Sequence, residues 1–303
     1  MARTDLSKGL LSRYERLEGQ RQNWETHWQE VADYMQPRKA DVTKKRARGD
    51  KRMEQVFDSS PIQAIELLAA SLHGMLTNPS TPWFTLRFKD EDIDNEDEAK
   101  LWLEASTDAM YTAFNRSNFQ QEIFELYHDL ITFGTACMFI EEDDDDIIKF
   151  STRHIDEVYI AENDKGRIDT VFRRFHISAR AAMQKFGDAT STDIKSIFKK
   201  DPYQEVEILH AVYPRSDFNP KKKDKGNMPF ESVYLEYKNS NELSVGGFKE
   251  FPFVVPRYLK ASNEIYGRSP AMTALPDVKM LNEMSKTTIK AAQKQVDPPL
   301  LVP

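Results

Sequence analysis

The sequence has little cysteine and little glycine, and it lacks long hydrophobic runs. Cys137 is the single cysteine, which excludes an internal disulfide and fits a reducing compartment. The eleven glycines are mostly isolated and form no GxxxxGK[ST] pattern, so a P-loop is excluded. No apolar stretch approaches the roughly 18 residues of a membrane span. The N-terminus is polar and charged, which excludes a signal peptide.

Signatures of catalysis are also missing. Neither HExxH nor GxSxG occurs, and the six histidines have no metal-ligand spacing. Two acidic clusters, 90–98 and 141–146, could chelate a divalent cation, but the second lacks the glycine and the spaced ligands of an EF-hand. We interpret both as solvated turns and Cys137 as a buried, inert thiol. The sequence therefore predicts no enzyme, no metal site and no cofactor.

What the chain does contain is enough apolar matter for a folded core. Its 303 residues are 40% hydrophobic and 30% charged, with a formal net charge of -7. That size allows one large domain or a few smaller ones. An acidic total argues against a nucleic-acid-coating protein, but it does not exclude one that guides DNA without gripping it. The apolar ending VDPPLLVP suggests a piece of a longer protein.

Periodicity predicts an α+β fold that is mainly helical. A helix is expected over 10–35 from apolar gaps of three and four residues. The basic segment 38–52 is predicted to be a mobile loop. Another helix begins with Ser60 as N-cap, in a capping box with Gln63, and should be buried on most sides. A short strand, WFTLRF, follows it.

The middle of the chain alternates as strands do. A hairpin is expected around Asp143 to Asp146, with further strands at VYIA and TVFRRFHI. Short helices follow at ARAAMQKF, capped by Ser178, and at TDIKSIFKK. EVEILHAVY and ESVYLEYK then predict a hairpin with a long basic loop, and FPFVVPRYL an edge strand.

The last helix, expected from Ser269 to Val296, has two distinct faces. Pro276 predicts a kink or a restart near its beginning. At 100° per residue one stripe holds small or apolar side chains, namely Val278, Leu281, Ser285, Ile289, Ala292 and Val296. Another face holds Lys279, Lys286, Lys290 and Lys294, interrupted by Glu283. At about 1.5 Å per residue the helix is about 40 Å long.

Two interpretations of that helix stay open. Lysines on a helix commonly mark a solvated face. Alternatively, the helix packs against copies of itself and turns a sparse cationic stripe toward phosphate. The basic loops 38–52 and 215–225 leave a similar choice between a solvated loop and a phosphate contact. Neither loop has interleaved aromatic residues, so base-specific recognition is not expected.

Five segments, taken in order, carry a resemblance to a known family. They are LTNPSTPWFTL (76–86), FELYHDLITFGTACMFIEED (124–143), HISARAAMQKFG (176–187), LHAVYPR (209–215) and the stretch 266–303. In this order and spacing the chain resembles the portal (head-to-tail connector) proteins of short-tailed phages, over nearly its whole length. No single motif is unique; the ordered set is specific. Members of the family are usually much longer, so the crown and much of the wing would be missing.

The resemblance implies a structural role with no chemistry of its own. Portal subunits form a ring, typically of twelve, at one capsid vertex, and double-stranded DNA passes through it non-specifically during packaging and ejection. Expected partners are capsid and scaffolding protein, the terminase, and tail or adaptor proteins that later replace it, with no membrane involved. Assembly would occur in the host cytoplasm. Twelve copies at -7 would carry about -84, which lets DNA slide.

The resemblance also implies a layout of wing, stem and clip. Residues 1–177 would be the wing, 178–200 the first stem helix, 201–262 the clip, 263–296 the second stem helix, and 297–303 the start of a channel loop. The four lysines of the last helix would line the DNA channel, and Val278, Leu281, Ile289 and Val296 would pack on neighbouring helices. The loop residues facing partners would be Arg215, Lys221, Lys222, Lys223 and Lys225.

Two other functions remain as alternatives. One is another virion adaptor or internal structural protein. The other is a metal-dependent phage nuclease that uses the acidic cluster at 141–146.

Overall fold

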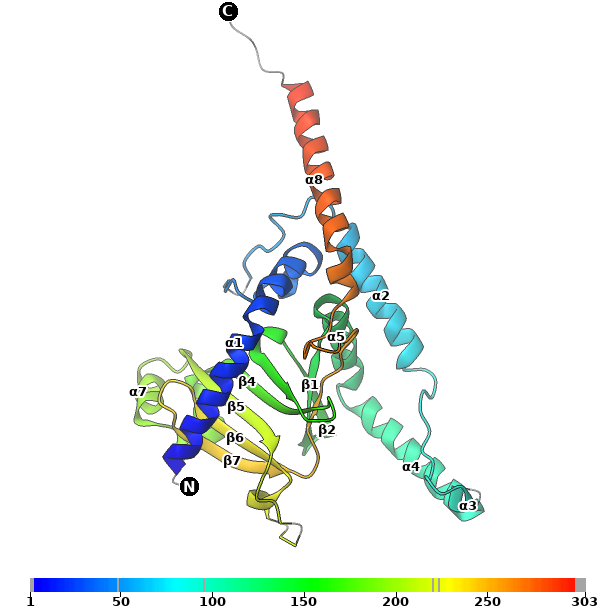
Figure 1. Cartoon of the computed structure of the whole chain (residues 1–303), viewed down its shortest axis with the longest axis vertical. Helices are drawn as coiled ribbons and strands as arrows, with labels where there is room; N and C mark the ends of the chain where they lie inside the picture. Colours follow the sequence, from blue (N-terminus) through cyan, green and yellow to red (C-terminus); the bar gives the residue numbers. More distant parts are fainter. Residues whose placement is uncertain (1–2, 48, 95, 220, 223, 298–303) are drawn as a thin grey trace, which may run out of the picture. The chain divides into compact units, whose positions relative to one another are not determined.

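The computed structural model describes residues 3–47, 49–94, 96–219, 221–222 and 224–297. The chain forms two compact units. Unit 1 takes the residues up to Glu25 together with Asp156–Phe253, and unit 2 takes Thr26–Ile155 together with the residues from Val254 onward. Helix α1 (Arg3–Met35) contributes to both (Figure 1). Helices and antiparallel sheets both occur, so the predicted α+β class is confirmed.

Unit 1 is built on a five-stranded antiparallel sheet with strand order β3-β4-β5-β6-β7. The strands are β3 (Val158–Glu162), β4 (Ile168–Ser178), β5 (Glu205–Pro214), β6 (Phe230–Glu236) and β7 (Glu242–Phe248). Alternate residues of β5 serve separate cores: Leu209 packs with Leu10 and Tyr14 of α1, and Ile208 packs with Ala179 and its neighbours. The hairpin predicted for β5 and β6 is confirmed, because the two strands pair directly.

Two short helices follow β4. Helix α6 (Ala179–Phe186) is capped by the Ser178 hydroxyl, as predicted, and α7 (Thr192–Lys200) is capped by Ser191. The 3-10 turn η3 (Gly187–Ala189) separates them.

A buried cation fixes α1 to the sheet of unit 1. The Arg21 side chain is 2% exposed, and its guanidinium donates to the carbonyls of Val158 (2.6 Å) and Asp156 (2.8 Å). It also pairs with Glu25 at 2.7 Å and lies 3.7 Å from the centre of the Tyr159 ring. Its donors are thus satisfied without water, which makes burial of the charge tolerable.

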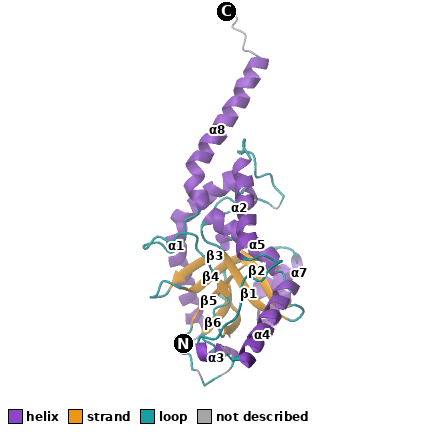
Figure 2. Cartoon of the chain, turned by 90° about the vertical axis from the view of Figure 1, so that its right-hand side faces the viewer, coloured by secondary structure: helices purple, strands orange, loops and turns teal. Residues whose placement is uncertain are grey.

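Unit 2 is mainly helical (Figure 2). Its helices are α2 (Ser60–Leu76), α3 (Glu91–Asp94), α4 (Asp97–Arg116), α5 (Phe119–Phe133) and α8 (Pro270–Val296), with the 3-10 turn η1 (Pro37–Lys39). The predicted hairpin is confirmed as β1 (Cys137–Asp143) and β2 (Ile147–Arg153). The short strand β8 (Phe253–Val254) lies where the chain passes from unit 1 to unit 2. Helix α5 is largely buried and forms the centre of the unit.

Close packing surrounds the end of α5. The Trp28 indole is fully buried and donates to the Phe133 carbonyl at 3.0 Å. Gly134 follows with φ of 77°, and a Cβ there would meet the Gly267 carbonyl oxygen at 2.3 Å. Only glycine fits this position, where the chain leaves α5 and passes the segment leading into α8.

Three expectations for residues 59–88 are wrong. Ser59, not Ser60, is the N-cap residue of α2, and its side chain makes no capping bond. Helix α2 is buried only along Pro61, Ile65 and Ala69, while Leu67 and Met75 are exposed. The segment 83–88 forms no strand, because side chains of α4 bind its backbone instead.

Other outcomes follow the sequence more closely. FPFVVPRYL forms a strand only at Phe253–Val254. Cys137 is fully buried, as predicted. Among the residues that the structure describes, no helix has the length and apolar character needed to cross a lipid bilayer.

Candidate functional surface on helix α8

Helix α8 begins where the Ser-Pro signal predicts. The Ser269 hydroxyl accepts a hydrogen bond from the Met272 backbone N–H at 3.0 Å and donates to the Thr132 carbonyl of α5 at 2.8 Å. Pro270 occupies the first turn, where its missing N–H costs nothing. The helix then runs through Pro276 to Val296 without the restart that the proline predicts. One cap thus starts the helix and ties it to the core of unit 2.

The proximal part of α8 is anchored by apolar burial and by one amide. Met272, Leu275 and Val278 are buried against unit 2. Asn282, only 5% exposed, accepts from the Phe57 backbone N–H at 2.7 Å and donates to the Gln55 carbonyl at 2.9 Å. We call this pair of bonds the Asn282 clamp. It fixes the segment before α2 to the middle of α8.

A neighbouring carboxylate supports the clamp. Asp58 lies 3.4 Å from the Ser285 hydroxyl and accepts from the Ser60 backbone N–H at 2.8 Å. The bonds from Ser60, with a smaller one from Ser285, hold the pKa of Asp58 below its ordinary value. Asp58 therefore stays an acceptor at neutral pH.

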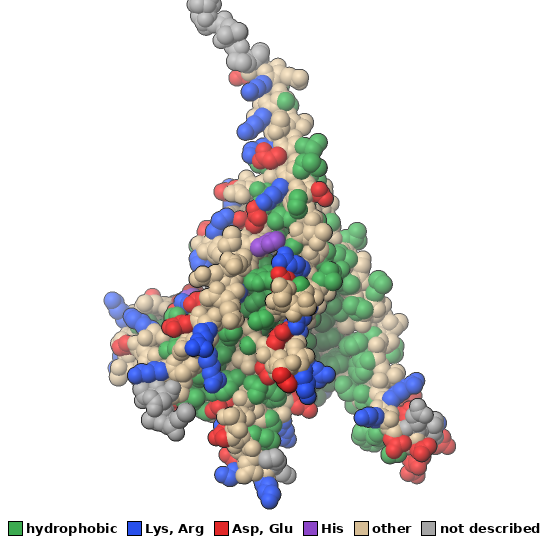
Figure 3. Space-filling model, in the orientation of Figure 1, with side chains coloured by type: hydrophobic (Ala, Val, Ile, Leu, Met, Phe, Trp, Pro, Cys, Tyr) green, Lys and Arg blue, Asp and Glu red, His purple; other side chains and the backbone are tan. Residues whose placement is uncertain are grey.

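The four lysines share a face but have different surroundings. Lys279 pairs with Glu30 of α1, and Lys286 pairs with Glu283 at 2.7 Å. Lys290 and Lys294 are exposed and form no ion pair within the described residues. Figure 3 shows basic side chains along one edge of α8 and hydrophobic ones along the other. Two of the four cations are therefore available to a partner.

The apolar stripe of α8 is buried only at its beginning. Val278 is 8% exposed, but Leu281, Ile289 and Val296 are 38%, 46% and 87% exposed. Ile289, Ala292 and Val296 form an open apolar surface along this part of the helix. Sequence reasoning missed Met280 and Met284, which lie on a third face and are also exposed. Leu281, Ile289 and Val296 are exposed within the described part of the chain. The predicted packing of the stripe on other helices stays a prediction.

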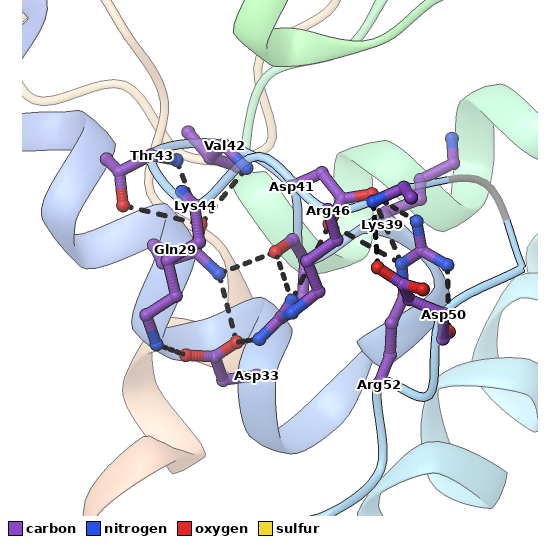
Figure 4. A network of polar contacts seen from close by, with 12 residues as sticks. Gln29, Asp33, Lys39, Asp41, Val42, Thr43, Lys44, Arg46, Asp50 and Arg52 are labelled. Atoms are coloured by element: carbon purple, nitrogen blue, oxygen red, sulfur yellow. Dashed lines mark hydrogen bonds and ion pairs between the residues drawn. The ribbon is translucent and has the colours of Figure 1, made fainter.

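Described residues of the basic loop 38–52 make many contacts with the rest of unit 2, although the sequence predicts a mobile loop. The Gln29 side-chain oxygen accepts from three successive backbone N–H groups, of Val42, Thr43 and Lys44 (Figure 4). Lys44 and Arg46 pair with Asp33. A phosphate would have to compete with these contacts, which weakens the interpretation of this loop as a nucleic-acid contact.

Further ion pairs fix both ends of the loop. Arg52 pairs with Asp41 at 2.5 Å, and Lys39 pairs with Glu125 (2.6 Å) and Asp129 (2.5 Å) of α5. Burial pushes the pKa of Glu125 upward, but the Lys39 ammonium, with a smaller contribution from Arg38, holds it below its usual range.

The second basic loop, 215–225, offers fewer free cations than its sequence suggests. Arg215 is turned inward, donating to the Met228 carbonyl at 3.2 Å and pairing with Glu231 at 3.2 Å. Lys221 and Lys222 are exposed. Lys223 and the side chain of Lys225 lie outside what the structure describes. Of the predicted partner-facing residues, two are thus placed on the surface.

The acidic clusters give no sign of a metal centre. Within the described ranges, no three His, Cys, Asp or Glu side chains are grouped so that they could hold a metal ion. The cluster at 141–146 belongs to the β1–β2 hairpin, where the Asp146 N–H donates to the Asp143 carboxylate at 3.1 Å. It serves as a turn.

Comparisons with known proteins agree with one another. A model of the family described as "Bacteriophage head to tail connecting protein" matches residues 7–303. The chain is 33% identical over 308 residues to the "Probable portal protein" of Bordetella phage BPP-1, covering 100% of this chain and 56% of that protein. It is 33% identical over 309 residues to the "Portal protein" of Salmonella phage epsilon15, covering 100% and 55%. The chain thus spans about half the length of these curated relatives.

Proposed function

Since this chain belongs to the family of bacteriophage head to tail connecting proteins, we propose that it is a portal subunit. Copies of it, twelve in the arrangement we favour, form the ring at one vertex of the capsid. The ring is the conduit for DNA during packaging and ejection. It acts by position and charge, with no catalytic step. Its place is the virion, after assembly in the host cytoplasm.

The observation that carries this proposal is the distal part of α8. It presents exposed apolar side chains on one face and the unpaired Lys290 and Lys294 on another. An isolated helix of this kind gains little in water, but in a ring its apolar stripe packs on neighbouring helices. Its lysines then face the duplex. A few cations in an acidic ring attract phosphate weakly and without base preference, so DNA can slide.

We assign the remaining regions to the portal layout as the resemblance to the family implies. The wing takes 1–177, the clip 201–262, the second stem helix 263–296, and the channel loop begins at 297. The first stem helix, 178–200, has weaker support than α8, since η3 divides it into two helices of eight and nine residues. The two compact units divide the chain elsewhere, so this layout remains a proposal.

We also propose the partners that a portal ring requires. Terminase docks on the clip first, and a tail adaptor replaces it. Capsid and scaffolding protein contact the ring during assembly. Lys221 and Lys222, exposed on the loop after β5, are the described cations that such partners would meet.

The channel role is tested by neutralising the lysine face. Replacing Lys286, Lys290 and Lys294 together with alanine should leave ring-shaped particles intact in electron micrographs. Packaged or retained DNA per particle should change, because the phosphate contacts are gone. The measurement is genome content per virion in a complementation assay.

A matched control uses three lysines of the region assigned to the wing. Lys8, Lys149 and Lys165 are exposed and carry the same total charge, and their alanine variant should package like wild type. Normal packaging and retention in the α8 variant would remove the channel role. Failure of that variant to form rings would assign the lysines to subunit packing instead. A full-length protein that stays monomeric under all conditions would count against the portal assignment.

A further inference from the structure

Unit 2 contains a cavity that α8 and its lysines do not use. It measures about 400 Å³ and lies where the end of α1, the loop 50–53, the start of α2 and α5 meet. Met35, Met53, Ile62 and Ile65 form apolar walls, and Arg38 stands at its edge. A cavity of this size is large enough for one large side chain.

Two residues that line the cavity each have a buried polar side-chain atom with no hydrogen-bond partner within the described structure. These atoms are Nδ1 of His128 and Nε2 of Gln36, on side chains that are 3% and 4% exposed. The other end of the Gln36 amide accepts from the Thr132 hydroxyl, so Nε2 is a donor. Burial lowers the pKa of His128, which keeps the imidazole neutral and able to accept. An unmade buried hydrogen bond is costly, so the cavity favours an occupant that offers one donor and one electron-rich surface.

The same unit exposes a tryptophan elsewhere. Trp102, in the second turn of α4, is 60% exposed, and its ring stacks on Phe88 at 5.8 Å. Its indole N–H makes no hydrogen bond within the described residues. On the same face Glu98 lies one turn earlier, and Ala105 and Ala109 follow at one and two turns. A tryptophan followed by small residues allows close approach of a partner, and tryptophans are frequent centres of interfaces.

The chemistry of the two places matches. An indole has one N–H donor for His128 Nδ1, and its π face can receive the Gln36 N–H. Charge matches as well: residues 87–100 contain seven acidic and three basic residues, whereas 37–52 contain eight basic and two acidic. The acids that pair with that loop from other elements, Asp33, Glu125 and Asp129, leave it net positive.

We propose that Trp102 of one copy inserts into this cavity of a second copy, with Glu98 beside Arg38. The Arg38 side chain is 57% exposed and can turn toward a second carboxylate. The two contacting surfaces differ, so each copy gives its tryptophan to one neighbour and receives one from the other. Contacts of this head-to-tail kind generate a ring when the rotation from one copy to the next closes, and a filament when it does not. The inference rests on the proposed portal function and names a contact that would build its ring.

Mixed single-cysteine variants test the contact directly. Ala105→Cys, one turn from Trp102 on the same face of α4, and Met53→Cys are made separately in the protein expressed from its complete coding sequence, so that Trp102 itself stays in place; Cys137 is fully buried and stays silent. The variants are mixed before assembly and treated with a short bis-maleimide. Cross-linked dimers should form in the mixture and not in either variant alone. Leu67→Cys, on the exposed face of α2 outside the cavity, replaces Met53→Cys as the control and should give none.

A charge exchange provides the second test. Glu98→Arg should raise the protein concentration needed for half-assembly about tenfold, and adding Arg38→Glu should restore it. Glu104→Arg, on another face of α4, is the matched control and should assemble like wild type. Trp102→Ala should weaken assembly at least as much as Glu98→Arg, with an unchanged thermal unfolding profile.

Two results would overturn the inference while leaving the portal role standing. One is normal ring formation by Trp102→Ala together with no cross-link in rings of the mixed variants. The other is cross-linking of Met53→Cys to a different virion protein in assembled particles. If wild-type protein forms no ring at all, the portal proposal and this contact fall together.

Discussion

The proximal and distal halves of α8 use similar side chains but bury them very differently. In residues 270–282, Met272, Leu275 and Val278 are covered by unit 2, and the Asn282 clamp fixes the last buried turn. In residues 283–296, Met284, Ile289 and Val296 are exposed. The first half contributes to the stability of the subunit, whereas the second keeps its apolar surface for contacts outside it. Apolar side chains therefore have two uses in one helix.

The largest expected difference between the two halves is the loss of stability when an apolar side chain is truncated to alanine. Leu275→Ala should lower the free energy of unfolding by about 2–5 kcal/mol, because a buried leucine is removed. Ile289→Ala, its distal counterpart, should change that free energy by less than about 0.5 kcal/mol. Urea denaturation followed by circular dichroism measures both. Equal losses for the two variants would abolish the distinction.

The clamp should show the next largest difference. Asn282→Ala leaves the Phe57 N–H and the Gln55 carbonyl without their partner, and should cost about 1–3 kcal/mol. Gln293→Ala, an exposed amide in the distal half, should stay within about 0.5 kcal/mol of wild type. Hydrogen exchange at Phe57 reports the clamp itself and should become faster only in the first variant. Unchanged protection there would mean that the amide is not what holds this segment.

The cap should contribute less. Ser269→Ala should lower stability by about 1 kcal/mol, through loss of the bond from Met272 and of the bond to Thr132. Ser285→Ala, whose hydroxyl lies 3.4 Å from Asp58, serves as the distal control and should have a smaller effect. Thermal unfolding of both variants gives the ranking, and a larger shift for Ser285→Ala would reverse it.

Acid should weaken the anchored half specifically. Burial, assisted by the charge of Arg268, lowers the pKa of His27, which lies near the Lys279–Glu30 pair. The unfolded chain takes up a proton near pH 6.5 and the folded chain resists it, so stability falls as pH drops below about 6.5. Helix α8 itself contains no histidine, so the effect comes from this side chain of α1 beside the anchored half. His27→Gln should flatten the decline between pH 7 and 5; parallel profiles for variant and wild type would contradict this origin.

Local signals in the sequence were reliable where the structure is also local. The Ser-Pro pair before α8 and the serine before α6 predicted caps that are present. Alternating residues predicted the pairing of β5 with β6, since the period of a strand identifies its two faces. The ordered segments of the portal family predicted the family match. Each of these depends on neighbours within a few residues or on a resemblance of the whole chain.

Non-local contacts could not be predicted in this way. Gln29 binds the backbone of the loop 38–52, which its basic composition predicts to be mobile. Glu30 pairs with Lys279, which lies far along the chain. Tyr111 binds the backbone of residues 83–84, which removes the need for a paired strand. Helix α2 shows a further limit of prediction from sequence. Its apolar residues do not reveal whether they are buried in the core or exposed on the surface.

The Asn282 clamp makes α8 a lever. From Asn282 to Val296 the helix extends about 21 Å, at about 1.5 Å per residue. A tilt of about 5° at the clamp would therefore move the tip by about 2 Å over that helical arm. Any load on the tip returns along the same path, through Asn282 into the backbone of Gln55 and Phe57 ahead of α2. The stiffness of these two hydrogen bonds, together with the apolar packing behind them, thus limits how far the end of the helix can swing.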